Sequence, residues 1–121
     1  MKRRIYYDST DAGGIVYHTE YIKFCEQARS EIFFKHNIFF EKEGYIVTSL
    51  NANYLKPAKL GEIIEIKTKV TQIKKASVKL LQEIFKGDEK IFTLEVNLAY
   101  MKENKISKIP PKHIKIFNEY A

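Results

Sequence analysis

The chain has 121 residues, of which 45% are hydrophobic and 30% are charged. This length suits one domain with a single core, and the composition is that of a folded protein rather than a disordered one. Lysine and arginine outnumber aspartate and glutamate by 21 to 15, which gives a net charge of +6. Such an excess favours anionic partners, but it does not choose between nucleic acid, an acidic carrier protein and the phosphates of a small molecule.

The sequence also bears on compartment and domain organisation. Cys25 is the only cysteine, so an internal disulfide is excluded, which fits a reducing compartment. The segment Met1–Asp8 has the basic residues of a signal peptide but no apolar run behind them. No stretch is apolar for long enough to cross a bilayer. We therefore expect a single domain over residues 1–121, located in the cytoplasm and without a membrane span.

The sequence of the first half of the chain indicates a strand, a loop and one long helix. A short strand is expected at Arg3–Tyr7, and the Asp, Ser, Thr and Gly content of residues 8–14 is typical of a loop. Apolar residues then recur at helix period between Thr19 and His36. The hydroxyl of Thr19 is the predicted N-cap of this helix. The apolar stripe consists of Tyr21, Phe24, Cys25, Ala28 and Ile32.

After this helix the apolar pattern changes to a period of two, which predicts strands. The expected strands are Ile46–Leu55, Glu62–Ile73, Ser77–Phe85 and the alternating run from Phe92 to Tyr100. Short turns join them, and Pro110-Pro111 starts a short terminal helix at most. The order of elements predicts an α+β protein in which an antiparallel sheet of about five strands wraps around one long central helix. This is the hotdog arrangement.

The segment from Tyr7 to Tyr21 carries the chemistry. It places an aspartate, two glycines and a histidine ahead of a helix N-terminus. That end of a helix offers unpaired N–H groups and about half a unit of positive charge, which suit the oxyanion formed when a thioester carbonyl is attacked. Gly13 and Gly14 would let the backbone come close to a ligand. Asp11 could then act as a general base on water or attack the carbonyl itself.

These residues resemble a known signature. Thr10–Gly14 and Val16–His18, flanked by Tyr7 and Tyr21, are similar to the motif of the 4-hydroxybenzoyl-CoA thioesterase-like hotdog proteins. The branch that the chain most resembles is the YbgC-type acyl-CoA thioesterases, which are often associated with the Tol-Pal envelope system. The helix segment Phe24–Arg29 and the strand end Asn53–Ala58 are similar to that family too, so the resemblance spans most of the chain.

The resemblance implies a single hotdog domain that hydrolyses acyl-CoA or acyl-carrier thioesters. Asp11 matches the catalytic carboxylate, acting as general base or nucleophile. His18 matches the start of the central helix, where a backbone N–H polarises the thioester carbonyl and the side chain assists. Tyr7 matches a tyrosine that lines the site. The implied substrate-binding residues are Gly13, Gly14 and Tyr17.

The resemblance also implies a homo-oligomer, a dimer or a tetramer, with the site between protomers. Coenzyme A would be part of the substrate, so no separate cofactor is expected. Two departures from the family pattern affect the rim of the site. Asp8-Ser9 replaces an acidic pair, and Thr19-Glu20 replaces Ala-Asn after the histidine. Acyl specificity and the choice between coenzyme A and a carrier protein therefore stay open.

Structural interpretations of the same residues stand beside the catalytic ones. Asp11 could close a turn by hydrogen bonding to its own backbone. His18 could cap the helix or pack against it, and Tyr7 could be a packing residue. Cys25 lies on the apolar stripe, where a free cysteine behaves as a small hydrophobe. The remaining histidines have no partners at metal-ligand spacing, so we expect no metal site.

Two other functional classes compete with hydrolysis. A hotdog protein could bind acyl-CoA or an acyl-carrier protein without chemistry, or could act as an envelope-assembly partner. A pure binder would not need Asp11 as a base beside His18, which favours the enzyme. The net charge alone suggests nucleic-acid binding, but the chain has no zinc pattern, no RNA-binding signature and no compact run of lysines with interleaved aromatics. We therefore expect no nucleic-acid partner.

Overall fold

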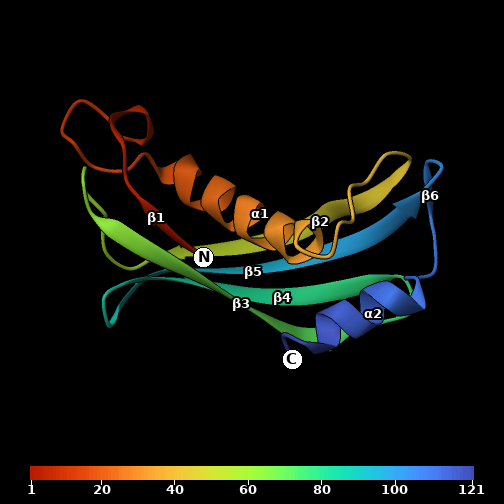
Figure 1. Cartoon of the computed structure of the whole chain (residues 1–121). Coiled ribbons are helices and arrows are strands. Elements are labelled where there is room, and N and C mark those ends of the chain that lie inside the picture. Colours follow the sequence, from red (N-terminus) through yellow and green to blue (C-terminus); the bar gives the residue numbers. More distant parts are fainter.

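The computed structural model describes all 121 residues, and one long helix lies in the concave side of a curved antiparallel sheet (Figure 1). The strands are ordered β1-β3-β4-β5-β2, and the short β6 pairs with the end of β5. All pairings are antiparallel. The elements are β1 (Lys2–Arg4), the 3-10 turn η1 (Tyr7–Ser9), α1 (His18–Phe34), β2 (Glu43–Tyr54), β3 (Ile63–Ile73), β4 (Ser77–Lys86), β5 (Glu89–Lys102), β6 (Lys105–Ile106) and α2 (Pro111–Asn118).

The two apolar faces predicted from periodicity, one on the helix and one on the strand, pack together in the core. Successive side chains of a strand point to opposite faces, so every second residue of β5 faces α1. The buried residues of β5 that follow the predicted alternation are Phe92, Leu94, Val96, Leu98 and Tyr100. All five residues of the predicted helical stripe are buried as well. The two sets belong to one hydrophobic cluster, and the predicted α+β hotdog fold is confirmed.

The N-terminal elements differ from the prediction. The first strand covers Lys2–Arg4 instead of Arg3–Tyr7, because only these residues pair with β3, and Tyr7–Ser9 turns into η1. Thr19 is not the N-cap of α1. The cap is Tyr17, one residue before the helix begins, and no side chain caps this end.

The terminal helix contributes more to the core than its sequence suggested. α2 lies beside the C-terminal half of β3, where the amide of Val70 donates to the carbonyl of Tyr120 at 2.8 Å (Figure 1). His113, Ile116 and Phe117 of α2 are buried. Neither α1 nor α2 combines the length and apolar composition needed to cross a bilayer.

His113 connects α2 to the sheet through a polar contact inside this core. Its Nδ1 lies 2.9 Å from the hydroxyl of Tyr45 on β2, and its Nε2 has no hydrogen-bond partner. Burial lowers the pKa of His113, although the carboxylate of Glu43 opposes this shift. The neighbouring Tyr100 donates a hydrogen bond to Glu43, and burial raises the pKa of Tyr100 to about 12. His113 is therefore a neutral, buried group that holds the second helix in place.

Candidate active site

The loop that carries Asp11 is a small hairpin held in place by backbone hydrogen bonds. Thr10 and Val16 pair across it, and the amide of Asp11 donates to the carbonyl of Ile15 at 2.9 Å. The amide of Val16 also donates to the carbonyl of Ala58 at 3.0 Å, which fixes the hairpin to the segment between β2 and β3. The loop therefore has a defined position at the end of the sheet next to the start of α1.

The side chain of Asp11 closes the tip of this hairpin. Its Oδ1 accepts hydrogen bonds from the amides of Gly13 at 2.8 Å and Ile15 at 3.2 Å. The turn-closing interpretation of Asp11 is thus correct for one carboxylate oxygen. Asp11 is exposed, and Oδ2 takes no hydrogen bond within the chain, so that oxygen can act on water or on carbon.

Both glycines of the motif belong to this turn. A β-carbon on Gly13 would lie 3.4 Å from the Oδ1 of Asp11, in van der Waals contact with the carboxylate. Gly14 has a φ of +77°, a left-handed conformation that costs other residues free energy. Their shared role in this structure is to shape the backbone that orients Asp11.

The start of α1 presents unused donors. Tyr17 is extended, and its carbonyl accepts the amide of Glu20 at 2.9 Å. The amides of His18 and Thr19 have no acceptor in the chain, because no side chain caps this end. Together with the partial positive charge of a helix N-terminus, these two N–H groups are free to donate to an anion at the helix start.

Two tyrosines fix the start of α1, and neither role was predicted from the sequence. The hydroxyl of Tyr54, the last residue of β2, donates to the carbonyl of His18 at 2.7 Å. The hydroxyl of Tyr21 accepts the amide of Ala58 at 2.9 Å, and its ring stacks on Phe92 with centroids 5.2 Å apart. Tyr54 falls inside the segment that resembles the family, and Tyr21 lies on the helical stripe. The sequence therefore marked both residues, but it did not predict the hydrogen bonds of their hydroxyl groups.

A cleft of about 350 Å³ lies beside the helix start. Of the six predicted site residues, only His18 lines it. The ring of Tyr17 packs against His18 with centroids 4.5 Å apart, and Tyr7 is 77% exposed in the single chain. Asp11, Gly13 and Gly14 belong to the adjoining hairpin. The lining residues are Ile15, Val16, His18, Tyr21, Tyr54, Leu55, Lys56 and Pro57.

The remaining reactive side chains lie elsewhere. Cys25 is buried, and this burial raises the pKa of its thiol to about 12, so the thiolate is scarce at neutral pH. His36 contacts Glu119 at 3.3 Å on the surface. No group of three or more His, Cys, Asp or Glu side chains is arranged to hold a metal ion.

The fold is that of a hotdog thioesterase, and comparison with known proteins agrees. Residues 13–93 match the model of the Thioesterase superfamily. The acyl-CoA thioesterase YbgC of Helicobacter pylori is 37% identical over 120 residues, covering 90% of both chains. The acyl-CoA thioesterase YbgC of Haemophilus influenzae is 30% identical over 119 residues, covering 93% of this chain and 88% of its own.

A solved structure supports the same assignment. The crystal structure of a probable thioesterase from Bartonella henselae aligns with a TM-score of 0.81 and 32% identity, covering 91% of this chain and 96% of that one. The chain belongs to the thioesterase superfamily, and its similarity to the YbgC proteins confirms the predicted branch.

Proposed function

We propose that this protein hydrolyses acyl-CoA or acyl-carrier thioesters at the start of α1. The observation that carries the proposal is the pair of unused amides at His18 and Thr19, which lie beside a cleft in a chain of the thioesterase superfamily. The YbgC relatives are named acyl-CoA thioesterases, which supports coenzyme A as the carrier. Coenzyme A is then part of the substrate, and no separate cofactor takes part.

Asp11 supplies the base or the nucleophile. As a base, its free Oδ2 takes a proton from water while the water oxygen bonds to the thioester carbon. The carbonyl electrons move to oxygen, where the first-turn N–H groups stabilise the charge. Collapse of this intermediate breaks the carbon–sulfur bond, and the thiolate leaves and takes up a proton. As a nucleophile, the same oxygen would bond to the carbonyl carbon and displace the thiolate, and water would then hydrolyse the resulting anhydride to the acid and the free Asp11 carboxylate.

The other motif residues have supporting roles in this proposal. The side chain of His18 assists orientation at the cleft, while its amide contributes to the oxyanion site. Gly13 and Gly14 bring the backbone close to the substrate, and Tyr17 contacts it beside His18. Tyr7 lines the completed site. We place this activity in the cytoplasm, which agrees with the free thiol of Cys25.

A second copy of the chain would complete the site, because α1 does not cover the edge strand β2. Val47, Leu50 and Tyr54 pair with buried residues of β5 and so face the same side of the sheet. They nevertheless remain 44%, 44% and 48% exposed. Apolar side chains on a free strand edge are normally paired or covered. We therefore propose a homodimer built on β2, and a tetramer as a dimer of such dimers.

A two-fold dimer uses the same patch of each copy. Because Tyr54 lies both on β2 and in the helix-start cleft, pairing along β2 would place the partner chain next to each active site. Tyr7 and Tyr17 are exposed in the single chain and would gain contacts there. The site would then depend on both protomers.

A free-thiol assay against short, long and aromatic acyl-CoAs and an acyl-carrier thioester tests the proposed function. We expect saturable release of the thiol from at least one member of the panel. Saturable binding without turnover of any member would instead favour the non-catalytic acyl-binding alternative.

A further inference from the structure

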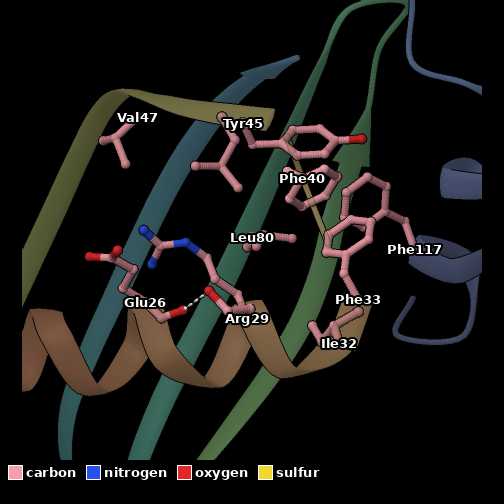
Figure 2. A pocket seen from close by; sticks show the side chains of 11 residues that line it. Glu26, Arg29, Ile32, Phe33, Phe40, Tyr45, Val47, Leu80 and Phe117 are labelled. Carbon is pink, nitrogen blue, oxygen red and sulfur yellow. Dashed lines mark hydrogen bonds between the residues drawn. The ribbon is translucent and has the colours of Figure 1, made fainter. Parts of the chain in front are cut away.

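A second cavity, separate from the helix-start cleft, lies between the C-terminal half of α1 and the sheet (Figure 2). It has a volume of about 240 Å³ and shares no lining residue with the first cleft. Arg29 on its wall is eleven residues beyond His18, which is about 16 Å along a helix axis. Its lining residues are Glu26, Arg29, Ser30, Ile32, Phe33, Phe40, Tyr45, Val47, Leu80, Leu98 and Phe117.

One side of this cavity is aromatic (Figure 2). The ring of Phe33 stacks with that of Tyr45 at 5.5 Å and meets those of Phe40 and Phe117 edge-on at 5.0 and 5.4 Å. Such walls favour a flat or branched apolar group. The volume equals that of about eight water molecules in the liquid, which suits a ligand of about ten non-hydrogen atoms.

The opposite wall carries a cation that the protein leaves largely unpaired. Figure 2 shows the side chain of Arg29 extending from α1 into the cavity. No carboxylate oxygen lies within 4.0 Å of Arg29. Its hydrogen bond, from a terminal guanidinium nitrogen to the Oε1 of Gln82, is long at 3.3 Å. A guanidinium has five N–H donors in a planar fork, so most of them are free for a ligand.

Arg29 is half-buried, and none of its guanidinium nitrogens is among the fully buried polar atoms without a partner, so its free donors face water or a ligand. A partly desolvated cation loses hydration that only hydrogen-bond acceptors can replace. This burial lowers the pKa of Arg29, and the charge of Glu26 on the same wall opposes the shift. A carboxylate would match the fork with two parallel, charge-assisted hydrogen bonds. Glu26 would repel a second negative charge on the same ligand.

We propose that this cavity binds a small monocarboxylic acid, with the apolar body of the acid against Phe33 and Tyr45 and its carboxylate on the guanidinium of Arg29. In the single chain this site lies apart from Asp11 and His18 and needs no thioester, so it goes beyond the proposed hydrolysis. Val47 on its wall belongs to the face of β2 that the proposed dimer would cover. An arylacetic acid suits the size of the cavity and carries its charge at one end of an aromatic body.

A purely structural role for Arg29 makes a different prediction. Gln82 is buried and donates to the carbonyl of Cys25 at 2.9 Å and to the hydroxyl of Thr68 at 3.1 Å, so Arg29 could simply orient Gln82. A structural role would change stability when Arg29 is replaced. It would give no preference for a carboxylate over a neutral ligand of the same shape.

The test compares phenylacetate with phenylacetamide, which has the same shape but no charge. Binding to the full-length wild-type protein is followed by NMR, using the side-chain Nε–H of Arg29 and the amides of Phe33 and Tyr45. We expect saturable shifts at all three residues, with phenylacetate binding about tenfold or more tightly than the amide, as charge-assisted hydrogen bonds imply. Equal affinities, or no binding, would overturn the proposal.

Variants then test whether the preference for phenylacetate over phenylacetamide depends on the side chain of Arg29. Arg29→Gln should remove the preference for phenylacetate, while Lys23→Gln, which removes an exposed cation from the same helix, should keep it. Asp11→Asn should bind phenylacetate as the wild type does. Ligand shifts centred on His18 and Leu55 instead of Phe33 would place the acid in the helix-start cleft and contradict the second site. If Arg29→Gln fails to fold, the comparison of acid and amide on the wild type still decides the question.

Discussion

The hydroxyl of Tyr54 donates a 2.7 Å hydrogen bond to the carbonyl oxygen of His18, which joins the end of β2 to the first residue of α1. This contact fixes the proposed oxyanion site against the edge strand that would meet a second copy of the chain. The position of the helix start therefore depends on the sheet as well as on the loop that precedes it.

Tyr54→Phe tests this connection. The ring and its edge-on contact with Tyr21 remain, so the lost hydrogen bond should cost about 0.5–1.5 kcal/mol of stability. We expect kcat/KM for thioester hydrolysis to fall by a larger factor than this loss explains, because the first-turn amides lose their register. Urea unfolding and steady-state kinetics measure the two effects. Tyr6→Phe, at an exposed tyrosine, is the control. Unchanged kinetics in Tyr54→Phe would show that the contact is only structural.

His18→Ala should reduce activity less than Asp11→Asn does. The backbone N–H at the helix start survives the substitution, so only orientation or a secondary hydrogen bond is lost. The comparison is made on kcat/KM with both variants shown to be folded by circular dichroism. His36→Ala, at an exposed histidine paired with Glu119, controls for the loss of an imidazole. Equal losses at His18 and Asp11 would mean that the His18 imidazole takes part directly.

Stability should depend on pH through His113. Its pKa is lowered in the folded protein by burial, whereas in the unfolded chain it should be near 6.5. The unfolded state then binds more protons between these two values, so the free energy of unfolding rises with pH in that window. The contribution is complete above about pH 7.5 and is lost as the pH falls below 6.5.

Urea unfolding of the wild type and of His113→Gln, measured between about pH 5 and 8, checks this dependence. The variant should be less stable at pH 8 because a buried contact with Tyr45 is altered. It should also lose less stability than the wild type on acidification. His36→Gln should keep the wild-type slope, and a slope that persists in His113→Gln would assign the pH dependence to other groups.

The proposed dimer can be weakened at Leu50. Leu50→Lys places a charge on the apolar face of β2 that remains 44% exposed in a single chain. We expect the wild type to elute as a dimer or tetramer and the variant to shift toward the 14.2 kDa monomer, with activity lost in parallel. Light scattering coupled to size exclusion measures the masses. Gln72→Lys, on the exposed surface of β3, should leave both unchanged. A fully active wild-type monomer would disprove the shared site.

Much of the fold was predictable because it follows from local periodicity. The alternation from Phe92 to Tyr100 and the helical stripe from Tyr21 to Ile32 each identify a buried face, and these faces pack together in the structure. The prediction of Thr19 as the N-cap was wrong because a contact with another segment decides where the helix starts. The amide of Tyr17 donates to the carbonyl of Ser9 at 3.0 Å, which ends the extended segment one residue before His18.

The site was predictable as a motif but not as a geometry. The segment around Asp11 indicated a loop before a helix. The turn that Asp11 closes by accepting the amides of Gly13 and Ile15 becomes visible only in the three-dimensional structure. The anchor Tyr54 and the cavity cation Arg29 depend on contacts between residues more than thirty positions apart. Sequence spacing within one chain carries no information on such contacts.

The most direct test of the catalytic proposal is the rate of thiol release by Asp11→Asn on the best acyl-CoA substrate. The Oδ1 of asparagine can still accept the amides of Gly13 and Ile15, so the turn should persist while the basic oxygen is lost. We expect a fall of about a hundred- to ten-thousand-fold in kcat, the range for a positioned general base. Asp88→Asn, at an exposed aspartate in the turn between β4 and β5, should retain the wild-type rate. A folded Asp11→Asn protein that keeps about half of the wild-type rate or more would contradict the assignment of Asp11 as the catalytic group.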